Sequence, residues 1–152
     1  MGILVRAPGP MDTPSVPGVV LRTPSVADIP ALGRLYFEAY EPGVAASTET
    51  EAVEDIQLSF DGAYGVLDLN LSRLAWLDDQ LVGALLVVER APWPDTPDCP
   101  FIIELFTAPT HRRHGIARQL LSTCSAVTIA LRVDDNNTPA VTLYHALNFH
   151  DG

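Results

Sequence analysis

The chain contains no lysine, and all nine of its basic residues are arginine. A Walker A phosphate-binding loop requires a lysine, as does an enzyme that holds pyridoxal phosphate as a Schiff base. The absence of lysine therefore excludes both classes. The formal net charge is -10, which argues against nucleic acid as a partner, because its phosphates bind basic surfaces. We expect a neutral or cationic partner instead.

Cysteine and long apolar runs are also scarce. The only two cysteines, Cys99 and Cys124, lack the paired spacing of a metal site or a disulfide framework, so we expect two free thiols. No apolar run reaches the roughly 18 to 20 residues that a membrane helix needs, and the N-terminal segment lacks the long apolar core of a signal peptide. The sequence therefore predicts a cytoplasmic protein that does not bind membranes.

The length of 152 residues is typical of one domain. Residues 1–18 are rich in proline and glycine without periodicity, and we expect a flexible N-terminal arm there, followed by a single domain over residues 19–152. Helices are predicted to begin after Ser25, after Ser47 or Thr48, near Gly115 and after the DDNNTP turn. Strands are predicted at 19–22, through Trp76, and at 81–88, 101–107 and 127–133. This order, β-α-α-β-β-β-α-β-α, indicates an α/β fold with a mixed sheet.

One basic stretch, HRRHGIARQL at residues 111–120, follows the buried strand FIIELFT and opens a helix near Gly115. The first amides of a helix lack internal partners and carry the positive end of its dipole, which suits a phosphate. Gly115 and Ala117 leave room for a ligand beside the backbone, and Arg112 and Arg113 can add bidentate bonds. The pattern predicts a pyrophosphate site, although taken alone it also fits a solvated basic helix start.

The run from Thr107 to Ala117, TAPTHRRHGIA, resembles the V-x-P-x-x-R/Q-x-x-G-x-G/A signature of the GCN5-related N-acetyltransferase (GNAT) superfamily, with threonine for the first valine. RTPSVADIPAL resembles the opening strand and helix of that family, and LDDQLVGALLVV resembles its second hairpin. LRVDDNNTPAVTLYHALNF resembles the closing N-x-x-A-x-x-L-Y-x-x-x-G-F signature, with asparagine for the glycine. The matching residues there are Asn137, Ala140, Leu143, Tyr144 and Phe149.

The resemblance implies a GNAT-like fold, in which helices flank a mixed, mostly antiparallel sheet with a splayed pair of parallel strands at the cofactor site. It implies an acyl-CoA-dependent N-acetyltransferase that moves an acetyl group from acetyl-CoA to a primary amine of a small molecule or peptide, by direct attack in a ternary complex. Contacts to acetyl-CoA would come from the strand end, the loop and the last helix: Phe106, Thr107, Arg112, Arg113, His114, Gly115, Ile116, Ala117 and Asn137.

The same resemblance implies the catalytic residues. Tyr144 would protonate the leaving thiolate, and Glu104 would act as a base through water. A carboxylate within so apolar a strand is costly, and burial would raise its pKa toward a useful range. A structural role for Glu104 and a packing role for Tyr144 are the alternatives. Tyr36, Glu38 and Tyr40 are weaker candidates for acceptor binding, because exposed polar residues are common at helix ends.

Three other interpretations follow from the sequence. His111 and His114 lack a third ligand, so we expect no metal site. A helix-turn-helix over GIARQLLSTCSAVTIALRV is disfavoured, because its second helix would be β-branched and poor in side chains that read a DNA groove. A non-catalytic acyl-CoA-binding sensor or partner module remains the alternative to an enzyme.

The C-terminal end departs from the family pattern. GNAT members usually continue past the closing signature with one or two further strands beside the acceptor site. These strands would be missing through truncation, or supplied by another subunit or segment. An uncovered sheet edge favours pairing, so a homodimer is one expected arrangement.

Overall fold

A single mixed sheet forms the centre of the protein. The computed structural model describes residues 2–11, 16–40, 44, 46–112 and 114–152. Seven strands lie in the order β2-β3-β4-β5-β6-β1-β7, and all neighbours are antiparallel except β5 and β6. The strands are β1 (Gly2–Arg6), β2 (Val19–Arg22), β3 (Arg73–Leu77), β4 (Gln80–Val88), β5 (Phe101–Thr107), β6 (Ile129–Val133) and β7 (His150–Asp151). The predicted mixed, mostly antiparallel sheet is confirmed.

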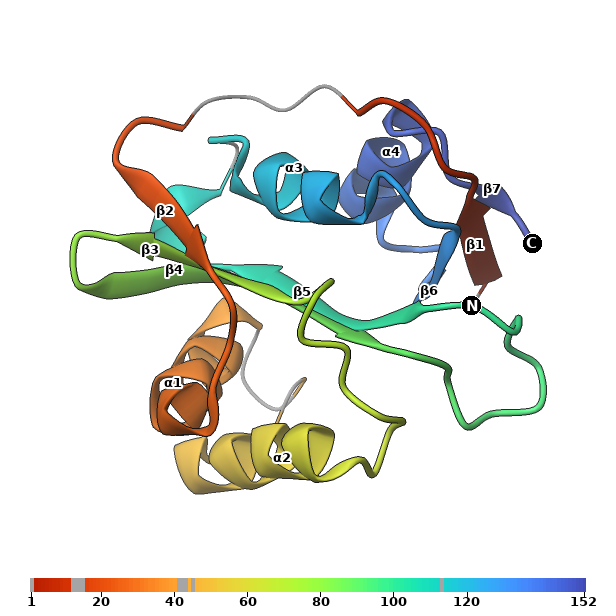
Figure 1. Ribbon diagram of the computed structural model, residues 1–152. Helices are drawn as coiled ribbons and strands as arrows, with labels where there is room; N and C mark the ends of the chain where they lie inside the picture. The colour runs from red at the N-terminus through yellow and green to blue at the C-terminus, as the bar shows by residue number, and fades with distance from the viewer. Residues whose placement is uncertain (1, 12–15, 41–43, 45, 113) are drawn as a thin grey trace.

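In the described part of the chain, α-helices cover both faces of the sheet (Figure 1). They are α1 (Ile29–Ala39), α2 (Glu49–Asp61), α3 (Ile116–Leu121) and α4 (Thr138–Ala146), with short 3-10 turns η1 (Val26–Asp28), η2 (Pro109–His111) and η3 (Ser122–Cys124). Helices α1 and α2 lie below the sheet in the view of Figure 1, and α3 and α4 lie above it. Within the described residues, no helix has the length and apolar character needed to cross a bilayer.

The predicted helix starts are confirmed by their capping contacts. The Ser25 amide donates to Asp28 Oδ2 at 2.8 Å, and the Glu51 amide donates to Thr48 Oγ1 at 3.1 Å. These bonds satisfy backbone donors that the first turn of a helix leaves without partners. After α4, Asn148 has a φ of 69°, a left-handed conformation that asparagine tolerates better than most residues. Asn148 therefore adopts the left-handed conformation at the position where the family signature has glycine.

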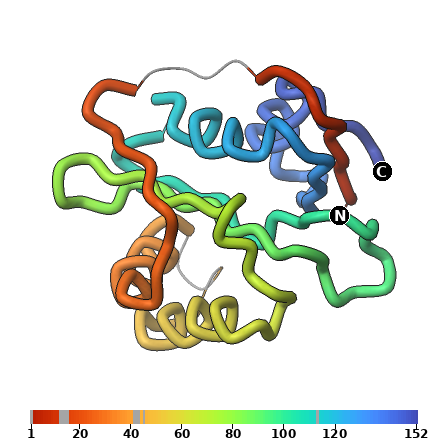
Figure 2. Tube along the Cα trace, in the orientation of Figure 1, coloured from red at the N-terminus to blue at the C-terminus, as the bar shows by residue number. Residues whose placement is uncertain are grey.

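The N-terminal segment differs from the sequence-based expectation. Residues Gly2–Arg6 form β1, which lies between β6 and β7 and pairs antiparallel with both. Figure 2 shows this segment beside the C-terminal segment, with both chain ends on the same side of the molecule. The strand beside β6 is therefore supplied by this chain and not in trans, so β6 needs no second copy to cover it.

Arg6 fixes β1 to the rest of the fold. Its side chain is 2% exposed, and its Nε donates to the Leu147 carbonyl, the C-cap of α4, at 2.7 Å. Its Nη2 donates to the Pro10 carbonyl at 2.9 Å, and longer bonds reach the carbonyls of Ala7 and Gly9. A buried guanidinium is costly unless its donors are satisfied, and here backbone carbonyls satisfy them. Arg6 thus joins the N-terminal strand to the last helix.

Candidate active site

The parallel strands β5 and β6 separate soon after they begin. Their only pairs are Phe101 with Ala130 and Ile102 with Leu131. From Ile103 to Thr107, β5 pairs with β4 alone within the described part of the chain. The backbone groups of this half of β5 that face β6 consequently have no strand partner, and an extended ligand can pair with them. This is the predicted splayed pair.

A β-bulge explains why the strands separate at this point. In the register between β4 and β5, Leu86 lies opposite Glu104 while its neighbour Val87 lies opposite Ile102, so Ile103 is an additional residue. A bulge bends its strand and increases the local twist. Because Ile103 immediately follows the last residue paired with β6, the bend directs the rest of β5 away from β6.

Glu104 is the first residue after this bulge. It lies on the same side of β5 as Phe106, two residues along, and the ring of Phe106 packs against Tyr36 of α1 at 5.5 Å between centroids. Glu104 therefore belongs to the face that α1 and α2 cover. Although the residue is half-buried, protein atoms surround its carboxyl closely, and this loss of water, followed by the charge of Asp55, raises its pKa to about 8.

All four tyrosines of the chain lie within the electrostatic reach of Glu104. Tyr36 and Tyr40, one turn apart on α1, contact each other edge to face at 5.4 Å. Burial and then the charge of Glu104 raise the pKa of both phenols. Each hydroxyl consequently stays protonated and can donate a hydrogen bond at the site.

Tyr144 reaches the site from α4, on the opposite face of the sheet. Its ring is buried against Phe149, with centroids 5.5 Å apart. Burial, followed by the charge of Glu104, raises the pKa of Tyr144 to about 12. The same hydroxyl also acts electrostatically on Tyr40. Glu104 of β5 and Tyr144 of α4 thus lie within electrostatic reach of each other.

The loop after β5 has the backbone that its sequence predicts. Gly115 is the N-cap of α3 with a φ of 87°, a conformation that a side chain disfavours. On the neighbouring strand β4, a Cβ added to Gly83 would lie 2.9 Å from Ile116 Cγ2. Two glycines therefore shape this region: one turns the loop into α3, and the other lets α3 pack closely on the sheet.

The side chains of the loop between β5 and α3 make contacts that the sequence did not predict. Arg112 is exposed, and its Nη2 donates to the carbonyl of Ala39, the last residue of α1. The guanidinium therefore lies near Tyr40, on whose phenol it acts electrostatically. His114 is exposed, its ring 6.1 Å from that of His111, and Arg113 lies outside the described residues.

A comparison with protein families covers the same elements of the chain. A family model described as the acetyltransferase (GNAT) family matches residues 30–149, which include α1, the separated strands, the loop and Tyr144. The chain belongs to the GNAT acetyltransferase family. The resemblance seen in the sequence is thereby confirmed. No curated protein sequence matches the chain.

Solved structures share the fold at low identity. The aminoglycoside acetyltransferase AAC(6')-Iy, solved with the bisubstrate analogue CoA-S-monomethyl-acetylneamine, is 18% identical with a TM-score of 0.66 over 88% of this chain and 91% of that chain. A Pyrococcus horikoshii OT3 protein is 19% identical with a TM-score of 0.69, over 84% and 86% of the two chains.

A GCN5-related N-acetyltransferase from Sphaerobacter thermophilus gives 20% identity and a TM-score of 0.67. The match covers 99% of this chain but 48% of that one, so this chain spans about half of that protein. Because almost the whole chain is covered, the likeness in fold includes β1. The arrangement of the GNAT sheet with an N-terminal strand beside β6 is therefore compatible with a known fold.

Two of the predicted site residues, Asn137 and Glu38, are exposed. Asn137 is an exposed N-cap of α4, and its Oδ1 accepts from the Ala140 amide at 3.3 Å. Glu38 is exposed on α1, two residues from Tyr36 and therefore on another side of the helix. Both remain predictions, and the structure gives Asn137 a capping role of its own.

Two other residues at the site escaped the sequence analysis. Asp55 lies on α2, and Tyr64 follows that helix. The Tyr64 hydroxyl donates to Asp55 Oδ1 at 2.5 Å, and this hydrogen bond is the main cause that raises the pKa of Tyr64 to about 12. The polar pattern of α2 is that of any half-exposed helix, so no sequence signal distinguished Asp55.

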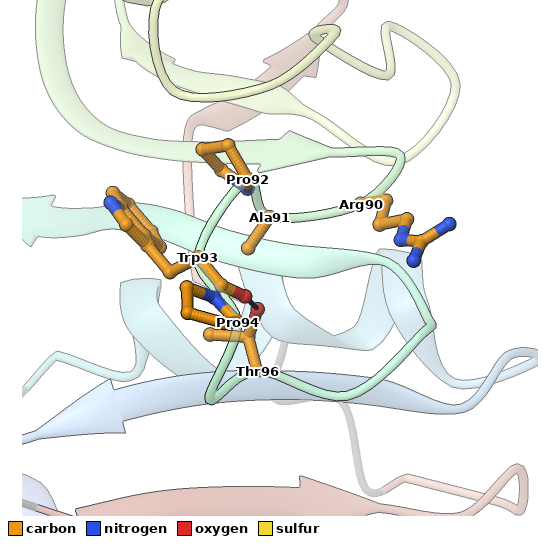
Figure 3. Close-up of a pocket in the computed structure, with 6 residues that line it drawn as sticks. All are labelled: Arg90, Ala91, Pro92, Trp93, Pro94 and Thr96. Atoms are coloured by element: carbon orange, nitrogen blue, oxygen red, sulfur yellow. Dashed lines mark hydrogen bonds between the residues drawn. The ribbon is translucent and has the colours of Figure 1, made fainter.

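A separate hollow lies at the other end of β5 (Figure 3). Its volume is about 430 Å³, and it is lined by Arg90, Ala91, Pro92, Trp93, Pro94 and Thr96. Trp93 packs against Phe101, the first residue of β5, at 6.1 Å between centroids. None of the predicted GNAT site residues lines this hollow. Among the described residues, no three His, Cys, Asp or Glu side chains come together as metal ligands.

Proposed function

We propose that this chain transfers an acetyl group from acetyl-CoA to a primary amine, by direct attack of the amine on the thioester in a ternary complex. The observation that carries the proposal is the separation of β5 from β6 next to Glu104, which lies within electrostatic reach of Tyr144. Membership of the GNAT family supports acetyl transfer in general.

The proposed binding of acetyl-CoA rests on backbone groups of the protein more than on its side chains. The unpaired half of β5, which includes Phe106 and Thr107, offers amide and carbonyl groups to the amides of a pantetheine arm. The turn at Gly115 presents backbone amides to the pyrophosphate. The related fold of AAC(6')-Iy binds a CoA-containing analogue, which agrees with this use of the fold.

The two side chains have the protonation states that the chemistry needs. With a pKa of about 8, Glu104 is partly ionised near neutral pH and can accept the proton that the attacking amine loses, directly or through water. A new C–N bond forms and the C–S bond breaks. Tyr144, protonated because its pKa is about 12, then gives its proton to the departing thiolate.

The acceptor is a primary amine of a small molecule or a peptide. The acidic chain and the carboxylates of Asp55 and Glu104 favour an acceptor that arrives with a positive charge. The tyrosine rings of α1 supply an aromatic wall on the same side. AAC(6')-Iy acts on an aminoglycoside, so polycationic amines belong in the first panel of acceptors.

The test is acetyl-CoA binding by calorimetry together with turnover against a panel of aminoglycosides, diamines and peptide N-termini. We expect turnover with at least one amine, and Tyr144→Phe should lower kcat about tenfold while the acetyl-CoA Kd stays unchanged. Tight binding of acetyl-CoA without turnover on any amine would instead identify a non-catalytic acyl-CoA-binding module. Absence of acetyl-CoA binding would contradict both.

A further inference from the structure

Asp55 is an unassigned acidic residue that faces the proposed base. It lies in the middle of α2, half-buried, and its Oδ1 accepts the Tyr64 hydroxyl at 2.5 Å. Its charge also acts on the Tyr36 phenol and is, after burial and the charge of Glu104, a cause of the raised pKa of Tyr36. Asp55 thus holds the hydroxyl of a loop residue after α2 and lies within electrostatic reach of Tyr36 on α1.

Within the described part of the chain, no arginine forms an ion pair with this carboxylate. Ion pairs join Arg34 with Glu49, Arg90 with Asp98, and Arg132 with Asp95, and none of these three involves Asp55 or Glu104. The groups that face Glu104 are the phenols of Tyr36 and Tyr40 on α1, Asp55 on α2, Tyr64 in the following loop and Tyr144 on α4. Among these described groups, Asp55 is the one whose charge contributes to the raised pKa of Glu104.

We propose that Asp55 is a positioning residue of the acetyl transfer, which holds the hydroxyl of Tyr64 in place and, through its charge, keeps Glu104 a strong enough base. The inference rests on the proposed function, because it assigns Asp55 a role in that reaction. Its physical basis is that a nearby negative charge disfavours the ionised form of a carboxyl. A carboxylate whose pKa lies near the working pH is the more effective general base.

The charge explanation and a merely structural one predict different results in two variants. Asp55→Asn is close to isosteric and removes the charge. Tyr64→Phe removes the hydroxyl that Asp55 holds but leaves the charge in place. Glu54→Gln is the matched control, because it removes the same charge one residue away on the exposed side of α2.

The decisive measurement is an NMR titration of the Glu104 carboxyl in protein labelled with ¹³C at glutamate side chains, assigned with Glu104→Gln. We expect Asp55→Asn to lower the pKa of Glu104 by about one unit, since the charge of Asp55 raises it. Tyr64→Phe should not lower it, and Glu54→Gln should leave it unchanged. An unchanged titration in Asp55→Asn would overturn the proposal. An equal fall in Tyr64→Phe would also overturn it, because a loosened α2 would then explain both.

Activity gives a second readout. In Asp55→Asn the rise of kcat/KM with pH should move to lower pH by the same amount, and kcat should fall, while the KM for acetyl-CoA stays unchanged. An unmoved pH profile in an active Asp55→Asn enzyme counts against the proposal. If the wild-type protein acetylates no amine, the proposed function fails, whereas the NMR titration still decides whether Asp55 controls Glu104. Should Asp55→Asn not fold, Asp55→Ser takes its place in both experiments.

Discussion

The two faces of the sheet at the end of β5 build their halves of the site in different ways. On the side of α3, the predicted contacts to acetyl-CoA come from one continuous stretch, residues 106–117, with Asn137 at the start of α4 as the one exception. On the face of α1 and α2, the groups around Glu104 come from two helices and the loop that follows them. The first half depends on local backbone conformation, and the second depends on tertiary packing.

This difference sets what each half can be used for. Backbone amides and a glycine turn hold a ligand whose chemistry does not vary, such as a pyrophosphate. Ionisable side chains in a half-dry environment acquire altered pKa values, which proton transfer requires. We therefore expect substitutions on the α1 and α2 face to change pH profiles and acceptor kinetics, and substitutions in the loop to change the affinity for acetyl-CoA.

The largest expected effect is that of Glu104→Gln. The amide cannot accept a proton, so kcat/KM should fall about 100-fold and lose its rise with pH toward about 8, while the acetyl-CoA Kd stays the same. Steady-state kinetics between pH 6 and pH 9 check the first part, and calorimetry checks the second. Full activity of Glu104→Gln would remove this residue from the mechanism.

Unfolding provides a control that does not depend on turnover. The pKa of Glu104 is about 8 in the fold and near 4.3 in an unfolded chain, so the fold favours the protonated form. Stability from this residue is present below pH 4 and is lost as pH rises to about 8. The Tm of Glu104→Gln relative to wild type should therefore increase across this range. A constant difference would mean that the carboxyl is not shifted.

A smaller effect is expected from Gly115→Ala in the loop. With φ at 87°, a Cβ costs about 1 to 2 kcal/mol, which is roughly tenfold in affinity if the loop relaxes and its amides turn away. We expect weaker acetyl-CoA binding by calorimetry and an unchanged pH profile. Gly9→Ala is the control, because its added Cβ would meet no atom within 4 Å. An acetyl-CoA Kd equal to wild type would show that the turn does not serve the ligand.

Most of the fold was predictable, because its elements carry local signals. The caps at Ser25 and Thr48 and the alternating or continuous apolar runs located the strands and α-helices from β2 to α4 within a few residues, but not the 3-10 turns η2 and η3. The strands β1 and β7 were not predicted. GILVR is short and precedes a proline-rich segment, and its partners in β6 lie more than 120 residues away along the chain. Its place depends on the buried bonds of Arg6 to the end of α4, which no local pattern encodes.

The residues of the candidate site also fall into two groups: those that a sequence motif identified and those that only the structure revealed. The GNAT signature identified the turn at Gly115, and the strand motif identified Glu104, because each is contiguous in sequence. The roles of Asp55 and Tyr64 required the packing of α2 against α1 and the sheet, so they became visible only in three dimensions. For Arg112, the sequence motif and the structure point to different contacts. Its position in the signature predicts an anion contact, whereas in the structure it bonds the end of α1.

The smallest expected effects concern Tyr40 and Glu38 of α1. The sequence suggested both as acceptor-binding residues without showing which of them matters more. Tyr40 packs at 6.3 Å from Phe106, and the charge of Glu104 acts on its phenol, so Tyr40→Phe should raise the acceptor KM about threefold through a lost hydrogen bond. Glu38 is exposed on another side of the same helix, and Glu38→Gln should leave acceptor KM and kcat unchanged. Both variants are compared in one assay at saturating acetyl-CoA. A larger loss in Glu38→Gln than in Tyr40→Phe would place the acceptor outside the tyrosine wall, on the solvent side of α1.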